Sequence, residues 1–408
     1  MSDTSSAEAT STGWSMPAAG EAHGKAAWNA VISLSLGVFG LVTAEFLPAS
    51  LLTPIAHDLK ISAGTAGQAV TMTAVFAAVA GPALVIGTAR IDRRMVVWSL
   101  SLLLVLSDLL AAVASNLWVL LAARVGLGIA LGGIWSLAAA LCLRLVPAAL
   151  MPRAMSIVFT GMTAASVCAP ALGVFIGGLW GWRATFLVAS GIGMLALLFQ
   201  VITLPRMPPV DAPGLGTFAL LLRRPSIRIG LITVILVMSG HFAGFTYVRP
   251  FMEQVPRLDV RMISLVLLAL GVGGFFGNLA GGMVSGRSAR LASGLAGLIL
   301  AAATLTLLVY GASTTVAVVA TAAWGFGFGA FPISIQTWTT QAAPDHAESA
   351  GALLVSTFQV AIAVGAVAGG LLVDDLGAPG VIGYCGLATL VGGLTMLALA
   401  RPGSRAPV

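Results

Sequence analysis

The sequence has very few charged residues. Only 8% of its 408 residues are Asp, Glu, Lys or Arg, whereas 58% are hydrophobic. A soluble protein of this composition would lack the polar side chains that are needed to cover its surface. The scarcity of charge therefore excludes an ordinary soluble protein. It also means that any charge inside an apolar run needs a structural or functional reason.

Cysteine is rare as well. The three cysteines are far apart in the sequence, and each lies within or at the edge of an apolar run: Cys142, Cys168 and Cys385. This spacing argues against a disulfide framework or a cysteine metal cluster, and it favours buried small hydrophobic side chains.

Asp345, His346 and Glu348 resemble a metal cluster, but we interpret them as the solvated start of a helix. No cofactor is expected.

Long apolar runs make up most of the sequence. Runs of roughly 20 residues are long enough to cross a hydrocarbon core of about 30 Å as helices. Twelve such spans are predicted, at about 27–50, 66–88, 95–115, 117–141, 155–179, 184–204, 229–251, 260–284, 291–312, 314–336, 348–372 and 378–400. The fold class is therefore an all-α polytopic membrane protein, with the lipid bilayer as its surroundings.

The basic residues are distributed unequally between the two sides of the membrane, so the net charge of +6 does not indicate binding to nucleic acid. With the N-terminus inside, fourteen of the twenty Lys and Arg residues fall in the cytoplasm, five fall outside, and Arg124 stays within a span. The cytoplasmic set is Lys25, Arg90, Arg93, Arg94, Arg144, Arg153, Arg206, Arg223, Arg224, Arg228, Arg287, Arg290, Arg401 and Arg405. This asymmetry predicts that both termini are cytoplasmic.

The pattern divides the chain into five segments. Residues 1–26 are rich in small polar residues and are predicted to be a disordered cytoplasmic tail, not a signal peptide. Six spans follow at 27–204, then a proline-rich cytoplasmic linker at 205–228, then six more spans at 229–400. Residues 401–408 form a second cytoplasmic tail. The two six-span halves are weakly alike at an offset near 200 residues, which favours a duplicated unit with a central cavity.

Only two carboxylates and one arginine fall well inside the spans: Glu45, Asp108 and Arg124. By residue count, all three lie roughly 10 Å below the outer surface of the membrane. A lone charge at such a depth costs about 3 kcal/mol or more, so mutual pairing is expected.

This group has two interpretations. Low dielectric disfavours an ionised carboxylate while a nearby guanidinium favours it, so a proton could be bound in one state and released in another. On this interpretation Glu45 carries the proton, Arg124 is its electrostatic partner, and Asp108 is the next candidate. The alternative is a structural ion pair that fixes three helices.

Polar and aromatic side chains within spans form the pool of candidate substrate ligands. The predicted set is Gln68, Trp135, His241, Tyr247, Trp324, Gln336 and Gln359. His241 is the only histidine well inside a span, and its neutral ring both donates and accepts hydrogen bonds. For the aromatic residues the alternative is packing or contact with lipid.

Three segments carry a resemblance to a known family. The segment 124–128 (RVGLG), the segment 169–173 (APALG) and the basic loop 90–94 (RIDRR) resemble motifs of the major facilitator superfamily. The match is incomplete, because Ala89 replaces the usual Asp of the loop and Ala169 replaces the usual Gly. Further stretches resemble the drug and sugar efflux group of proton antiporters, and within it exporters of purine ribonucleosides: 45–54, 66–71, 131–135, 144–147, 181–183 and 245–250.

The resemblance implies a monomeric transporter of the bacterial inner membrane that exchanges protons for a small-molecule substrate. Its implied substrates are purine ribonucleosides such as inosine, and the alternative is export of sugars or amphipathic drugs by the same fold. An integral-membrane enzyme is not expected, because the sequence has no clustered nucleophile, acid–base pair or metal site. A channel fits the buried acid–base residues less well than alternating access does.

Overall fold

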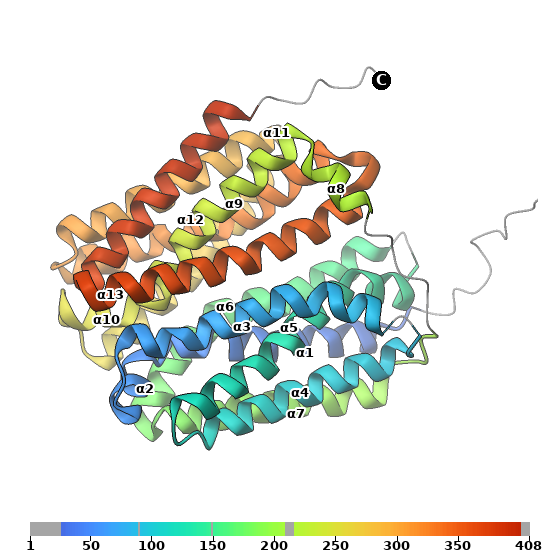
Figure 1. Ribbon diagram of the computed structural model, residues 1–408, viewed down its shortest axis with the longest axis horizontal. Coiled ribbons are helices and arrows are strands. Elements are labelled where there is room, and N and C mark those ends of the chain that lie inside the picture. The colour runs from blue at the N-terminus through green and yellow to red at the C-terminus, as the bar shows by residue number, and fades with distance from the viewer. Residues whose placement is uncertain (1–25, 89, 148–149, 209–215, 401–408) are drawn as a thin grey trace, which may run out of the picture.

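The computed structural model describes residues 26–88, 90–147, 150–208 and 216–400. Every regular element in these ranges is helical (Figure 1). The predicted tails at 1–26 and 401–408 lie outside the described residues, apart from residue 26.

The first group of helices ends before the linker. It comprises α1 (Trp28–Ser50), α2 (Leu52–Leu59), α3 (Ala63–Gly87), α4 (Arg93–Ala112), α5 (Leu117–Leu145), α6 (Met151–Trp180) and α7 (Trp182–Thr203). A short helix, α8 (Gly216–Leu222), lies within the predicted linker. The second group comprises α9 (Pro225–Thr246), α10 (Val248–Gln254), α11 (Val260–Tyr310), α12 (Thr314–Ala342), a 3₁₀ turn (Pro344–His346) and α13 (Ala347–Leu399).

Ten of these helices are long and apolar enough to cross a membrane, and two of the ten contain a sharp break. Helix α11 has 51 residues and breaks at Ser288, while α13 has 53 residues and breaks at Gly377. Each is more than twice the length that a hydrocarbon core of about 30 Å requires, so each forms two spans. Ten helices of which two form two spans each are consistent with the twelve predicted transmembrane segments.

The two breaks are tighter than the sequence predicted. A loop of several residues was expected between the spans that end near 284 and begin near 291, but a single non-helical residue, Ser288, makes the turn. Gly377 adopts φ 70° and ψ 179°. That positive φ is accessible to glycine at no steric cost, which explains why the chain reverses there.

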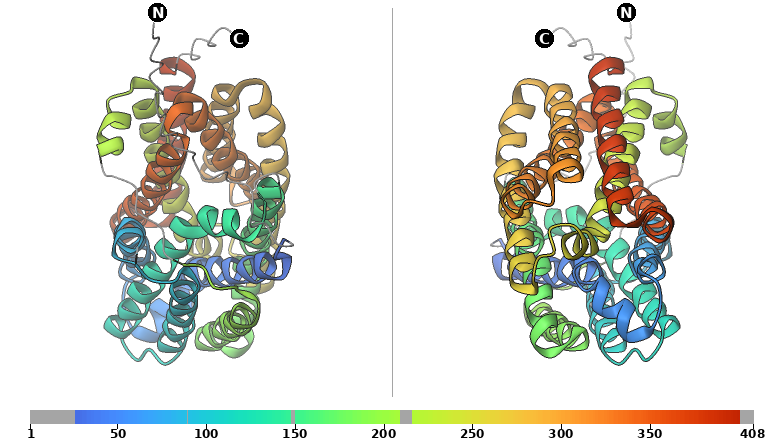
Figure 2. Two further views of the ribbon diagram at one scale, coloured as in Figure 1. Left: turned by 90° about the vertical axis from the view of Figure 1, so that its right-hand side faces the viewer. Right: turned by 90° about the vertical axis from the view of Figure 1, so that its left-hand side faces the viewer.

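The two groups of helices lie side by side, with their long axes running in roughly the same direction (Figures 1 and 2). They meet where α3 packs on α13 and where α6 packs on α11. The short helices α2 and α10 lie at one end of the bundle, which we call the far end, and α8 lies at the opposite end, which we call the linker end (Figure 1).

Local sequence explains where several helices begin. Asp92, Asn116 and Asp259 each precede a helix, and each side chain accepts a hydrogen bond from a backbone N–H of its first turn. Such a cap contributes about 1 kcal/mol. Within α5, an added Cβ at Gly128 would lie only 2.5 Å from the carbonyl oxygen of Thr73 on α3. The absence of a side chain at Gly128 thus allows close packing of α5 against α3.

The linker end carries an ion pair between two loops. Arg224, which precedes α9, donates to both carboxylate oxygens of Asp345 at 2.7 and 2.5 Å. These hydrogen bonds lower the pKa of Asp345 to about 2. Helix α9 begins at Pro225, within the predicted linker at 205–228.

Candidate functional site

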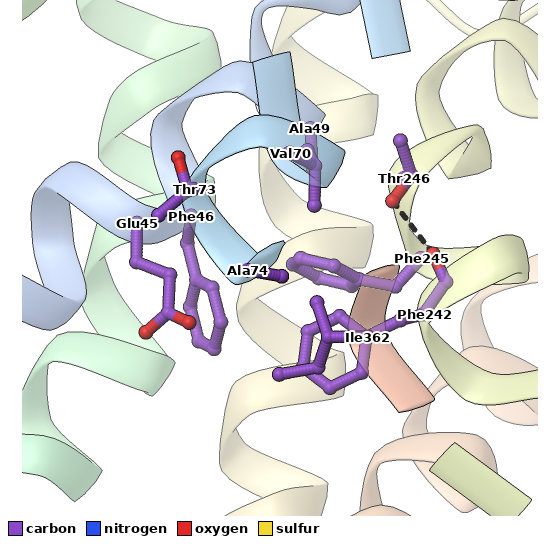
Figure 3. A pocket seen from close by; sticks show the side chains of 10 residues that line it. All are labelled: Glu45, Phe46, Ala49, Val70, Thr73, Ala74, Phe242, Phe245, Thr246 and Ile362. Atoms are coloured by element: carbon purple, nitrogen blue, oxygen red, sulfur yellow. Dashed lines mark hydrogen bonds between the residues drawn. The ribbon is translucent and has the colours of Figure 1, made fainter. Parts of the chain in front are cut away.

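A pocket lies where the two groups of helices meet. Its lining residues come from α1, α3, α9 and α13: Glu45, Phe46, Ala49, Val70, Thr73, Ala74, Phe242, Phe245, Thr246 and Ile362 (Figure 3). Helices α1 and α3 belong to the first group, and α9 and α13 belong to the second. A ligand held here would touch both groups.

Glu45 is the one lining side chain with a free polar group. The hydroxyl of Thr73 donates to the Ala69 carbonyl at 3.0 Å and accepts from Arg124 at 2.9 Å, and the hydroxyl of Thr246 donates to the Phe242 carbonyl at 2.6 Å. The Glu45 side chain is half-buried, and within the described ranges no donor or cation pairs with its carboxylate. Glu45 is therefore available to a proton or to a ligand.

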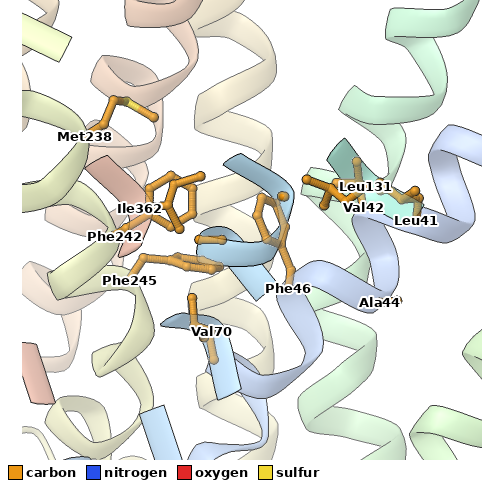
Figure 4. Close-up of a cluster of buried hydrophobic side chains, with 14 of the residues drawn as sticks. Leu41, Val42, Ala44, Phe46, Val70, Leu131, Met238, Phe242, Phe245 and Ile362 are labelled. Carbon is orange, nitrogen blue, oxygen red and sulfur yellow. The ribbon is translucent and has the colours of Figure 1, made fainter. Parts of the chain in front are cut away.

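Three phenylalanines supply the aromatic surface of the pocket. Phe46 of α1 lies edge to face with Phe245 of α9, with ring centroids 5.2 Å apart, and its centroid is 6.4 Å from that of Phe242. Figure 4 shows these rings within a cluster of buried hydrophobic side chains. The Phe46–Phe245 contact joins the two groups of helices, so separation of the groups would open a slot between aromatic rings.

Arg124 lies behind this pocket and is completely buried. Its Nε donates to the hydroxyl of Thr73 and, at 3.3 Å, to the carbonyl of Ala69, while one terminal nitrogen donates to the carbonyl of Ala44 at 3.0 Å. The guanidinium thus ties α5 to α1 and α3, directly beside the backbone of Glu45. Its other terminal nitrogen, NH2, has no partner among the described residues.

The predicted pairing of Arg124 with a carboxylate is wrong for this conformation. In the described part of the chain, no carboxylate oxygen lies within 4.0 Å of a guanidinium nitrogen of Arg124. Glu45 and Asp108 are nevertheless close enough to interact electrostatically with the guanidinium. Asp108 is fully buried, and neither of its oxygens has a hydrogen-bond partner among the described residues. Two backbone carbonyls and the hydroxyl of Thr73 take the place of the predicted carboxylate, which composition alone could not predict.

His241 lies next to the pocket, within the second group of helices. Its Nδ1 accepts a 2.9 Å hydrogen bond from the indole of Trp324, and its ring stacks on Phe328 with centroids 3.8 Å apart. The ring of Phe245 is 5.7 Å away on a nearly parallel plane. His241 therefore supports a wall of the pocket without lining it.

The other predicted ligands divide into three sets. Gln359 is buried, its Oε1 has no partner among the described residues, and it shares a face of α13 with Ile362 of the pocket. Tyr247 and Trp324 are completely buried and do not line the pocket. Trp135 is half-buried, and Gln68 and Gln336 are exposed; none of these three lines the pocket.

The described residues contain no group of three His, Cys, Asp or Glu that could hold a metal ion.

The three phenylalanines were not among the site residues predicted from the sequence. Phe46 directly follows Glu45, and Phe242 and Phe245 lie one and four residues after His241. This proximity to the two singled-out polar residues was a usable signal. It was overlooked because phenylalanine within an apolar span is ordinarily a core or lipid-facing residue.

A comparison with sequence families gives one family match. The family described as the Major Facilitator Superfamily matches residues 34–361, which is most of the chain and includes the pocket residues of α1, α3 and α9.

Comparisons with individual proteins agree with that match. The chain is 39% identical over 374 residues to the "Purine ribonucleoside efflux pump NepI" of Salmonella enteritidis PT4, covering 92% of this chain and 94% of that protein. It is 40% identical over 350 residues to the protein of the same name from Salmonella paratyphi B, covering 86% and 88%.

Two solved structures share the fold. One is a D-xylose–proton symporter, with a TM-score of 0.74, 17% identity, and coverage of 92% of this chain and 98% of that one. The other is a bacterial homologue of the human lysosomal transporter Spinster in an inward-facing, unoccupied conformation. Its TM-score is 0.71, with 15% identity and coverage of 92% and 95%.

Proposed function

Because the chain belongs to the Major Facilitator Superfamily, we propose that it exports purine ribonucleosides, such as inosine, in exchange for protons. A transporter of this family performs transport and not catalysis. The substrate class follows the names of the relatives that are about 40% identical over most of the chain. The observation that carries the proposal is the pocket between the two groups of helices, with its free carboxylate and three aromatic rings.

The pocket chemistry suits a nucleoside. A purine base is flat and aromatic, so it can stack against Phe245 or Phe242 once the two groups separate. The ribose carries hydroxyl groups, which can donate to the carboxylate of Glu45 or to the unpartnered Oε1 of Gln359. A neutral nucleoside therefore finds both an apolar surface and hydrogen-bond acceptors.

Glu45 is the proposed proton carrier. Its carboxylate faces the pocket and has no partner among the described residues, so it is free to exchange a proton with water or substrate. Arg124 is the proposed electrostatic partner, because it is anchored to the backbone one residue before Glu45 and keeps one unpartnered nitrogen. Asp108, which is buried near the same guanidinium, is the second candidate.

The proposed cycle is alternating access of the segments 27–204 and 229–400 around this pocket. The linker end is assigned to the cytoplasm, because the basic residues concentrate there. The bacterial inner membrane is the proposed location, both termini are assigned to the cytoplasm, and the protein is proposed to act as a monomer.

Transport into inverted membrane vesicles tests the proposal. Vesicles that contain the protein should accumulate labelled inosine when the interior is made acidic, and accumulation should collapse when an uncoupler removes the proton gradient. Vesicles without the protein are the control. Gradient-driven accumulation of arabinose-like sugars or dyes without accumulation of inosine would assign the protein to sugar or drug export, for which the largely apolar pocket wall also offers a surface.

A further inference from the structure

The contacts at the far end of the bundle indicate a gate, and this inference does not depend on which solute the protein transports. We propose that Asp374 and the glycines Gly64 and Gly67 form a latch that closes the far end of the transporter. This latch would have to open whenever the pocket is exposed on that side. The inference takes from the proposed function only the orientation in which the far end faces the periplasm.

The centre of the latch is a carboxylate from one group of helices bound to a helix terminus of the other. Asp374 of α13 accepts a 2.8 Å hydrogen bond from the hydroxyl of Ser62 and a 3.1 Å hydrogen bond from the backbone N–H of Gly64. Ser62 itself caps α3 by accepting from the N–H of Thr65 at 3.0 Å. Asp374 thus adds a second acceptor, from the opposite group, to the positive end of a 25-residue helix.

Two glycines make this approach possible. An added Cβ at Gly64 would lie 2.5 Å from the carbonyl oxygen of Gly370 and 2.8 Å from Cγ of Asp374. An added Cβ at Gly67 would lie 2.6 Å from Cζ of Tyr247 and closer still to its hydroxyl. Since carbon atoms do not approach this closely, any larger side chain on this face of α3 would hold the two groups apart.

Tyr247 fills the space that the glycines leave. It is completely buried between α3 and α13, and its hydroxyl lies 3.5 Å from the carbonyl of Gly64 and 3.4 Å from that of Ala366. Both distances are long for a hydrogen bond between oxygens, so its main contribution is packing. This position gives Tyr247 a role in the proposed gate, and its contact with substrate stays a prediction.

A second set of contacts lies nearby at the same end. Arg249 donates to Glu253 at 2.8 Å within the second group and to the carbonyl of Ser50 in the first group, also at 2.8 Å. Glu253 in turn accepts from the hydroxyl of Thr53 at 2.6 Å. The hydrogen bond from Ser62 to Asp374 is exposed to solvent and the one from Gly64 is half-buried, and polar contacts that water can reach are individually weak. A latch of several weak contacts can release during each transport cycle.

Access of a thiol reagent to the pocket tests the latch. Ala49 lines the pocket and is 2% exposed, so Ala49→Cys is introduced into protein in which Cys142, Cys168 and Cys385 have been replaced by serine or alanine. A membrane-impermeant maleimide is then applied to intact cells. Asp374→Ala removes two hydrogen bonds, and Gly64→Ala places a Cβ against Gly370 and Asp374. Both variants should raise the open population and speed labelling from outside by roughly fivefold or more.

The chain offers matched controls. Asp375 is the exposed neighbour of Asp374 and makes no hydrogen bond or ion pair with the described residues. Gly87 lies at the other end of α3 and has no atom within 4 Å of an added Cβ. Asp375→Ala and Gly87→Ala should leave labelling unchanged. If all four variants label equally, the latch is wrong. If labelling occurs only in inverted vesicles, the proposed orientation fails instead.

A crosslink gives an independent measurement if the alanine variants are poorly expressed. Ser62→Cys with Asp374→Cys, joined by a short reducible dithiol crosslinker, should stop transport, and reduction should restore it. Transport at the uncrosslinked rate by fully crosslinked protein would overturn the proposal.

Discussion

The indole N–H of Trp324 donates a 2.9 Å hydrogen bond to Nδ1 of His241, in the interior of the second group of helices. An indole nitrogen only donates, so Nδ1 must be the unprotonated nitrogen, and the neutral ring carries its hydrogen on Nε2. Stacking of the same ring on Phe328 fixes its orientation. The pair therefore holds one wall of the aromatic pocket in place.

Trp324→Phe should weaken transport without abolishing it. The substitution removes one buried hydrogen bond to His241, which is worth about 1 kcal/mol, so the KM for substrate should rise roughly fivefold. His241→Ala should have at least the same effect, because the ring also supports Phe245. Initial rates in vesicles measure both. Trp118→Phe is the control, because Trp118 is 77% exposed. An unaltered KM combined with low expression would mean that the pair serves only packing.

Phe245→Ala should weaken binding of an aromatic substrate. Stacking of aromatic rings contributes about 0.5–1.5 kcal/mol beyond the burial of area, so the KM should rise by roughly three- to tenfold, whereas Phe245→Tyr should retain most of the affinity. Competition by a series of unlabelled nucleosides measures the change. Phe276→Ala is the control, since Phe276 is 57% exposed. Equal losses for the alanine and tyrosine variants would argue against stacking.

A reporter fused after Arg224 should be located in the cytoplasm. The distribution of Lys and Arg residues motivates this orientation, and α8 lies at the same end of the bundle. Paired fusions to alkaline phosphatase and to a fluorescent protein should give fluorescence without phosphatase activity. A fusion in the α10–α11 loop, after Pro256, should give the opposite result. Phosphatase activity after Arg224 would reverse the topology.

Asp345→Asn should lower the stability of the protein slightly, and only above about pH 4. The hydrogen bonds from Arg224 lower the pKa of Asp345 to about 2, below its ordinary value of about 3.9. A lowered carboxylate pKa contributes stability that is present above the ordinary value and is lost as the pH falls toward the folded value. The difference in Tm between wild type and variant should therefore be constant from about pH 5 to 8 and shrink below about pH 4. Asp375→Asn should produce no such difference.

The sequence predicted the architecture well, because the hydrocarbon thickness imposes a length on every span. It located the long helices to within a few residues. It overestimated the loop at Ser288, because a reversal at one residue leaves little polar signal in the sequence.

The hydrogen-bond partners of Arg124 could not be predicted from the sequence. Composition identifies the charge, but two of the three partners of the guanidinium are the carbonyls of Ala44 and Ala69, which every residue type supplies. The same limit applies to Tyr247, whose predicted role was binding of substrate. Its burial against two glycines of other helices depends on how the two groups meet.

The central claim is that Glu45 couples proton movement to export. Glu45→Gln keeps the size and hydrogen bonding of the side chain but cannot ionise. The variant should therefore insert and bind substrate, yet lose accumulation of labelled inosine against its gradient. Asp108→Asn is the comparison and should do less harm, because Asp108 lies outside the pocket lining.

The decisive measurement compares uphill accumulation with exchange in the same inverted vesicles. The account predicts that Glu45→Gln abolishes acid-driven accumulation of labelled inosine while exchange of labelled for unlabelled inosine survives. Accumulation by Glu45→Gln at the wild-type rate, with the wild-type pH dependence, would contradict it.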